Sequence, residues 1–303
     1  MQGLGYRPGV VSWKKRINDA LSKTTGYQLE RAVPRSAPKG GRRRPGRGLR
    51  KGDRFVKEPV FVMCTLRSGS TLLRVLLNSH SKIHAPHEIH LRYISVNLDR
   101  KWSERSMKEM GLDADTLRYL LWDRILHREL AGSGKPIIVD KTPNNVFITD
   151  ELRACWPDAR FIFLLRHPAA IAESRRNWFK GRPEAYDADA NFDLIRRYCE
   201  ALEDARQRYD GITVRYEELT ENPDKVTHEI CEFLGIEWEQ AMLEYGKQEH
   251  GRYKSGLGDW SDNIKSGEVQ KAKPPPPETP EPLRPIAAKW GYLTEETPAV
   301  RAS

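Results

Sequence analysis

The sequence predicts an α/β protein built in three layers, with a mostly parallel sheet covered by helices on both faces. Short apolar segments rich in β-formers alternate with longer segments of helical periodicity between residues 59 and 236. The strand segments are apolar at almost every position, as in sheets that are buried on both faces. A turn of small residues follows the first strand and leads directly into a helix, which indicates a P-loop-like anion-binding loop.

The expected elements follow one another along the chain. Strands are predicted at 59–64, 136–140, 160–165 and 211–216. Helices are predicted at 71–79, 116–130, 169–179, 193–209 and 223–236. In the helix at 116–130, one side is expected to be buried, and it carries Leu120, Leu121, Ile125 and Leu130.

The chain divides into three expected regions. Residues 1–57 combine an amphipathic helix at 11–32 with a basic linker, which we expect to be partly disordered. Residues 58–267 form the α/β domain. Residues 268–303 form a proline-rich extended segment, and its helical patch at 286–293 is expected to dock on the domain.

The net charge of +9 is concentrated in the basic linker. Residues 39–57 hold nine Lys or Arg and one acidic residue, so this stretch alone contributes +8. Its composition is typical of a solvated linker, and the alternative is an arm for RNA, DNA or anionic lipid. The charge is therefore a property of one tail, and we do not expect nucleic acid as a partner of the domain.

Cysteine usage and hydropathy set limits on the compartment. The four cysteines are scattered without a C-x-x-C pair, which argues against a zinc site or a disulfide framework and favours a reducing compartment. No apolar run reaches the roughly 18 residues of a membrane span. The N-terminus also lacks a signal-peptide core. We expect a soluble, cytoplasmic protein.

The loop after the first strand reads Arg67, Ser68, Gly69, Ser70 and Thr71. The nucleotide-triphosphate signature places a lysine directly after its second glycine, and here that position is a serine. The backbone N–H groups at the start of the helix remain donors for an anion. A shorter mixed anion such as a phosphosulfate would suit this loop. The alternative is a serine-rich helix cap that binds no ligand.

Cations follow the other predicted strands as well. Lys141 follows the strand at 136–140, and Arg166 follows the strand at 160–165. Ser174 lies eight residues after Arg166 in the next helix, where both side chains can reach one phosphate group. Because ligands of parallel sheets bind beyond the carboxyl ends of the strands, the sequence predicts a crevice for a polyanion.

Three motifs together resemble the sulfotransferases that use 3′-phosphoadenosine 5′-phosphosulfate (PAPS). These are "RSGSTLL", "FLLRHPAAIAES" and "VRYEEL", within a resemblance that spans residues 58–265. The arginine in the first motif is similar to the tyrosylprotein and carbohydrate branch of that family. The resemblance implies that the loop at 67–71 holds the 5′-phosphosulfate, that Arg166 and Ser174 hold the 3′-phosphate, and that Tyr216 contacts the adenine. It also implies that Ser261, in a late glycine-containing loop, approaches the phosphosulfate.

The same resemblance implies a catalytic glutamate after the first helix, and Glu88 lies in the matching stretch "HAPHEIHL". A hydroxyl acceptor must lose its proton as it attacks sulfur, which a carboxylate base can accept. His87 and His90 remain alternatives, since another branch of the family uses histidine. Lys141 would stabilise the charge on the bridging oxygen. We expect Asp140 to orient its neighbours, because this reaction needs no metal.

The sequence thus predicts transfer of a sulfuryl group from PAPS to a hydroxyl group of a small-molecule or carbohydrate acceptor. Two alternatives from other classes stay open at this point. One is a P-loop kinase with a degenerate loop, which would require ATP and Mg²⁺. The other is a nucleic-acid-binding protein that acts through the basic tail, whose affinity would fall steeply with salt.

Overall fold

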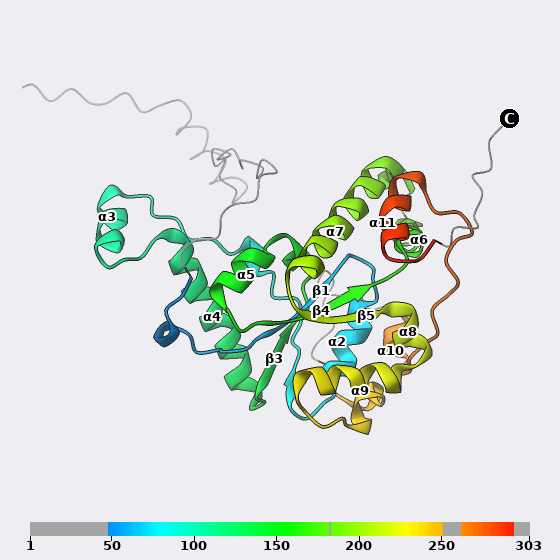
Figure 1. Ribbon diagram of the computed structural model, residues 1–303, viewed down its shortest axis with the longest axis horizontal. Coiled ribbons are helices and arrows are strands. Elements are labelled where there is room, and N and C mark those ends of the chain that lie inside the picture. The colour runs from blue at the N-terminus through cyan, green and yellow to red at the C-terminus, as the bar shows by residue number, and fades with distance from the viewer. Residues whose placement is uncertain (1–47, 182, 251–261, 294–303) are drawn as a thin grey trace, which may run out of the picture. The chain divides into compact units, whose positions relative to one another are not determined.

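A computed structural model describes residues 48–181, 183–250 and 262–293. It contains a five-stranded parallel sheet in the order β2-β3-β1-β4-β5 (Figure 1). The strands are β1 (Val60–Cys64), β2 (Ile83–His84), β3 (Ile137–Asp140), β4 (Arg160–Leu165) and β5 (Gly211–Arg215). The four strands expected from the sequence are confirmed, and β2 is a two-residue edge strand that was not predicted.

The described α-helices pack around the sheet, except for the helix Lys101–Glu109, which has no buried residue. They are α2 (Ser70–Asn78), α3 (Lys101–Glu109), α4 (Ala114–Ser133), α5 (Thr149–Cys155), α6 (Pro168–Trp178), α7 (Ala188–Arg208), α8 (Tyr216–Glu221), α9 (Pro223–Leu234), α10 (Asp262–Lys265) and α11 (Arg284–Lys289). The five predicted helices correspond to α2, α4, α6, α7 and α9. None of the described helices is long and apolar enough to cross a membrane.

Two separate apolar cores cover the two faces of the sheet. In β1, Phe61 and Met63 point into the core that α4, α5, α7 and α11 close, whereas Val60 and Val62 point into the core formed with α2, α8 and α9. Every residue of β1 is fully buried. Because successive side chains of a strand point to opposite faces, an all-apolar strand requires cover on both sides. The three-layer prediction is confirmed.

The buried face of α4 matches the predicted one only in part, because Leu120 and Leu130 pack against the core from partly buried positions. Leu121 is 41% exposed, and the buried positions include Tyr119, Trp122, Asp123 and Leu126. The leucine pattern was misleading because an acidic residue belongs to the buried face. The Asp123 carboxylate accepts hydrogen bonds from the backbone N–H groups of residues 55 and 56 and from the indole of Trp156. It thereby fixes the chain that leads into β1.

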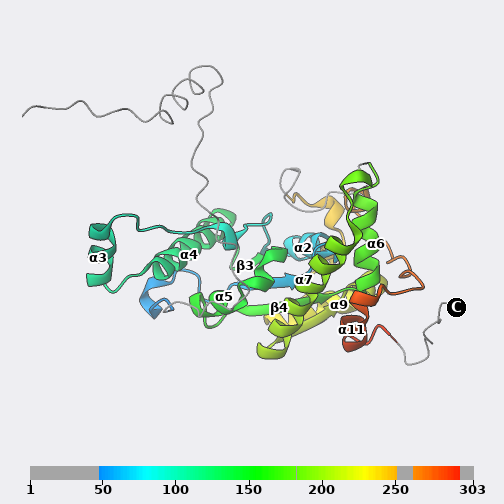
Figure 2. The same cartoon turned by 90° about the horizontal axis from the view of Figure 1, so that it is seen from above.

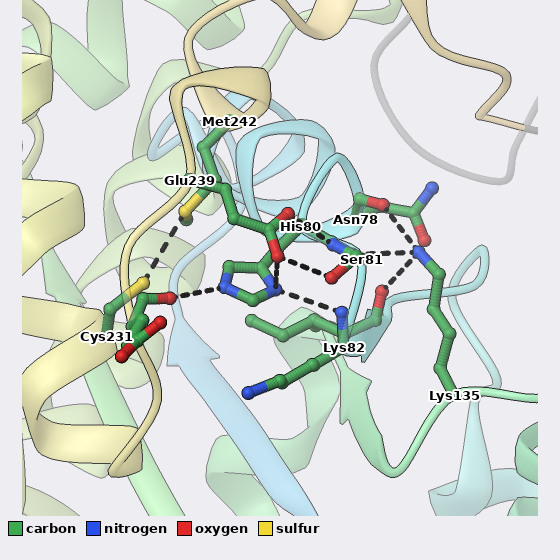
Figure 3. A network of polar contacts seen from close by, with 10 residues as sticks. Asn78, His80, Ser81, Lys82, Lys135, Cys231, Glu239 and Met242 are labelled. Carbon is green, nitrogen blue, oxygen red and sulfur yellow. Dashed lines mark hydrogen bonds and ion pairs between the residues drawn. The ribbon is translucent and has the colours of Figure 1, made fainter.

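The C-terminal end of α2 is held by a polar network (Figure 3). Lys135 Nζ donates to the backbone carbonyls of Asn78, His80 and Ile83 over 2.8–3.0 Å. The carboxylate of Glu239 accepts from the backbone N–H of Ser81 at 2.8 Å. A lysine at a helix C-terminus neutralises the partial negative charge of the last carbonyls. The network therefore fixes α2, whose opposite end faces the functional site.

The C-terminal segment packs on the α/β domain through its last described helix. Leu283, Ile286 and Trp290 are buried in the core beside α7, and α11 lies next to α6 and α7 (Figures 1 and 2). The expected helix at 11–32 and the candidate residue Ser261 lie outside the described residues.

Candidate active site

The loop between β1 and α2 has the backbone of an anion cradle. Gly69, at the N-cap of α2, has φ +82°, and a Cβ at this position would lie 2.1 Å from Cε2 of Tyr216. Only glycine combines this left-handed backbone with such close contact. It also has no side chain that could cap the helix, so the first-turn N–H groups point out of α2 without intrahelical acceptors. Ser70 and Thr71 begin the helix at this end.

The neighbouring residues of the loop have different roles. Ser68 is fully buried, and its hydroxyl donates to the carbonyl of Thr65 at 2.8 Å, which closes the turn. The Ser68 hydroxyl thus stabilises the turn, and Ser68 does not line the cavity described below. Arg67 has φ +60°, an uncommon conformation for a residue with a side chain. Its Nε donates to the hydroxyl of Ser174 at 3.2 Å.

Arg166 connects this loop to the end of β4. Its Nη1 donates to the carbonyl of Arg67 at 2.8 Å, and its guanidinium lies 4.4 Å from the ring centroid of Tyr216. Its Nε is buried without a hydrogen-bond partner among the described residues. Burial lowers the pKa of Arg166, and the nearby Tyr216 and Glu217 act against this shift. Arg166 also lines the cavity described below.

One cavity of about 1100 Å³ is lined by most of the predicted phosphate-binding residues, but not by the buried Ser68. Those that line it are Arg67, Gly69, Ser70, Thr71, Arg166 and Ser174. Its walls include the loop at 66–72, one face of α6, Tyr216, Tyr245 and residues 263–274. Six of the lining side chains are Arg or Lys and three are Glu. The parallel sheet explains this convergence, because the loops that follow its strands meet at one edge. The polyanion crevice expected from the sequence has the matching charge.

At one end of the cavity, Glu88 forms a buried ion pair with Lys141. The Lys141 ammonium is 1% exposed and lies 2.5 Å from Oε1 of Glu88, whose side chain is 12% exposed. The other carboxylate oxygen, Oε2, lies 3.4 Å from Nε2 of His90. His87 is exposed, and its ring nitrogen contacts only the carbonyl of Glu88 among its described hydrogen bonds. The three candidate proton acceptors therefore occupy different environments.

Asp140 and Thr142 hold the segment that carries Glu88. The buried Asp140 carboxylate accepts from the hydroxyl of Thr142 and from the side-chain amide of Asn145, both at 2.8 Å. The Thr142 oxygen in turn accepts from the backbone N–H groups of Ile89 and His90 at 3.1 and 3.4 Å. Burial raises the pKa of Asp140, which these hydrogen bonds oppose. This geometry matches the orienting role expected for Asp140.

Sequence reasoning did not find every cation of the cavity. Arg175 follows Ser174 directly, and its Nε and Nη2 donate to the side-chain oxygen of Asn191 at 2.9 and 2.7 Å. Because that partner is neutral, the arginine charge is not cancelled by it. Lys271 and Lys273 reach the cavity from the proline-rich segment. The double arginine after Ser174 was a usable signal for Arg175, whereas the path of the C-terminal segment was not encoded in a local pattern.

Comparison with known proteins identifies the family. The model of the sulfotransferase family matches residues 59–240, which is more than half of the 303 residues. The chain belongs to this family. Family and fold together support sulfuryl transfer as the reaction. The described residues contain no group of three or more His, Cys, Asp or Glu that could hold a metal ion.

Several individual proteins are similar. Protein-tyrosine sulfotransferase 2 of Gallus gallus is 25% identical over 211 residues, which cover 63% of this chain and 55% of the relative. The nodulation protein NoeE of Sinorhizobium fredii is 29% identical over 215 residues, which cover 59% and 51%. The chain thus spans about half the length of these curated relatives. The solved sulfotransferase domain of a Synechococcus olefin synthase has a TM-score of 0.57 at 21% identity, covering 78% of this chain and 97% of that chain.

Proposed function

We propose that this protein transfers the sulfuryl group of PAPS to a hydroxyl group of a small-molecule or carbohydrate acceptor. The observation that carries the proposal is the shared cavity, which joins the Arg67 loop, the pair Arg166 and Ser174, and Glu88. A triphosphate is disfavoured because the loop lacks the lysine that reaches β- and γ-phosphates. A cofactor with phosphate groups at two separate positions can bind both to the Arg67 loop and to Arg166.

The residues divide into two binding regions. The turn at 67–71, with its backbone N–H groups and the Arg67 guanidinium, would hold the 5′-phosphosulfate. Arg166 and Ser174, which both line the cavity, would hold the 3′-phosphate. The ring of Tyr216 lines the cavity beside Arg166 and offers an apolar surface to the adenine. We retain Ser261 as a proposed contact of the phosphosulfate.

The remaining residues act on the acceptor and on developing charge. PAPS, when bound, supplies the sulfuryl group. Glu88 Oε2 is the carboxylate oxygen that Lys141 does not occupy, and we assign it to take the proton of the acceptor hydroxyl. Lys141 and Arg67 supply positive charge where negative charge develops, so that positioning and electrostatics provide most of the catalysis.

The test is a comparison of two nucleotides by isothermal titration calorimetry. Adenosine 3′,5′-bisphosphate should bind at least about tenfold more tightly than AMP, because a charge-assisted contact contributes roughly 1.5–3 kcal/mol. Arg166→Lys should reduce this preference. Arg196→Lys is the control, since Arg196 is an exposed helix residue paired with Asp193 and Glu200. Equal affinities of the wild-type protein for the two nucleotides would refute the proposal.

A further inference from the structure

The carboxylate of Glu217 joins two segments that are distant in the sequence. Glu217 is the second residue of α8, directly after Tyr216. Its Oε1 accepts from the backbone N–H of His167 at 2.9 Å, and its Oε2 accepts from the hydroxyl of Tyr292 at 2.8 Å. His167 directly follows Arg166. The C-terminal segment is therefore connected to the arginine of the cavity through one side chain.

The position of Tyr292 is fixed by contacts with its neighbours. The guanidinium of Arg215 lies 4.7 Å from its ring centroid, and the ring of His167 lies 4.9 Å away. Two residues earlier, the fully packed Trp290 donates its indole N–H to Glu203 at 2.9 Å, and its carbonyl accepts from Arg215. The segment that carries Tyr292 is thus anchored on α7 and on the end of β5.

The hydroxyl of Tyr292 decides what the Glu217 carboxylate can do. With both oxygens occupied by donors, Glu217 stays turned toward His167 and Tyr292. Without the hydroxyl, Oε2 loses its partner. Two cations lie in this region: Arg215 packs against the Tyr292 ring, and Arg166 directly precedes His167, whose N–H the carboxylate holds. Glu217 already acts electrostatically on Arg166. An ion pair between the two would compete with a bound phosphate for the guanidinium.

We propose that Tyr292 is a positioning residue for the 3′-phosphate, which acts through Glu217 to keep Arg166 available. This inference rests on the proposed function, because it assumes that Arg166 binds the 3′-phosphate. It assigns a role in cofactor recognition to the C-terminal segment, more than one hundred residues away from Arg166 in the sequence.

The test uses Tyr292→Phe, which removes one oxygen and keeps the ring. Tyr209→Phe is the matched control, since the Tyr209 hydroxyl also donates to a carboxylate, Asp150, at 2.7 Å, but lies outside the cavity. Each variant is titrated calorimetrically with adenosine 3′,5′-bisphosphate and with AMP. The ratio of the two affinities is the readout, because a partial loss of folded protein affects both titrations equally and cancels.

In Tyr292→Phe we expect the bisphosphate to lose about tenfold in affinity, the lower end for a hydrogen bond to a charged group, while the AMP affinity stays unchanged. Tyr209→Phe should keep the wild-type ratio. A wild-type ratio in Tyr292→Phe, or an equal loss for both nucleotides, would overturn the inference and leave the proposed function intact. If the wild-type protein itself shows no preference for the bisphosphate, the proposed function fails and the inference fails with it.

Discussion

Replacing Glu88 by glutamine separates the two roles that we assign to this residue. The Glu88 carboxylate is the partner of the buried Lys141 ammonium and also the proposed proton acceptor. Glutamine keeps the size of the side chain and an oxygen that can accept from Lys141, but it has no charge and does not accept a proton at neutral pH. Glu88→Gln should therefore affect both the stability of the fold and the rate of turnover.

The expected loss of stability follows from the burial of the pair. At 2.5 Å, two unit charges attract each other by about 6–7 kcal/mol at an effective dielectric constant of about 20, before desolvation is subtracted. Breaking a buried pair typically costs about 3–5 kcal/mol, and the hydrogen bond that glutamine retains recovers roughly 1.5–3 kcal/mol. We expect a net loss of about 2 kcal/mol, which lowers Tm by about 4–8 °C.

The control for stability is Glu218→Gln. Glu218 pairs with Lys225 at 2.7 Å, but these side chains are 39% and 61% exposed. Solvent screens an exposed pair, so its loss should leave Tm close to the wild-type value. Thermal unfolding, followed by circular dichroism, compares the two variants directly. Equal values of Tm for Glu88→Gln and the wild-type protein would show that the buried ion pair contributes nothing to the stability of the folded state.

Turnover is measured as release of adenosine 3′,5′-bisphosphate from PAPS, with water alone and with a panel of phenols and saccharides. Glu88→Gln should lower turnover by roughly 10²-fold or more and leave cofactor affinity within a few-fold, because the carboxylate acts on the acceptor. His87→Asn should cost far less. If His87→Asn or His90→Asn abolishes turnover while Glu88→Gln remains active, a histidine is the base and our assignment is wrong.

Two further substitutions test the cradle and its supporting helix. Gly69→Ala should destabilise the protein by roughly 2–5 kcal/mol, because the backbone is left-handed and the new Cβ clashes with Tyr216. Gly111→Ala, at a similar φ but in open space, should cost only about 1–2 kcal/mol. Both free energies of unfolding are measured by chemical denaturation, and equal costs would show that the Tyr216 side chain moves aside without penalty. Burial lowers the pKa of His167 below the ordinary 6.5, so the unfolded state binds a proton more readily than the folded state. The free energy of unfolding should therefore be highest above the ordinary pKa and should decrease as the pH falls below it. In the wild-type protein, the N–H of Ala169 donates to His167 Nδ1. His167→Asn keeps a side-chain acceptor for this N–H but has no group that titrates in this range. Its urea midpoint should therefore decline less than that of the wild-type protein from about pH 8 to about pH 5, and parallel declines would contradict this.

The sequence predicted the parts of the fold that depend on local pattern. The apolar strands at β1, β3, β4 and β5 and the long helices have periodicities that one segment reveals by itself. The pattern was incomplete for the buried face of α4, where Asp123 is stabilised by donors from residues 55, 56 and 156. A carboxylate is buried only when such partners are present, and these partners are distant in the sequence. The two-residue β2 is too short to leave a pattern at all.

The same reasoning explains what could be predicted of the site. Arg67, Arg166 and Lys141 follow strands, and a parallel sheet brings such residues together without further information. The contact between Lys141 and Glu88 is different, because Glu88 lies on an irregular segment whose path depends on Thr142. A motif indicates which residues matter, but only the folded chain shows that two of them neutralise each other.

Two residues at the site have an uncommon backbone conformation. In the described part of the chain, the non-glycine residues with positive φ are Arg67 and His90, and both lie at the cavity or beside Glu88. Such a conformation costs roughly 1–2 kcal/mol for each residue. Each is held by a hydrogen bond from elsewhere in the sequence: Arg166 donates to the carbonyl of Arg67, and the N–H of His90 donates to Thr142. Backbone strain of this kind is expected where side chains must keep a fixed geometry for catalysis.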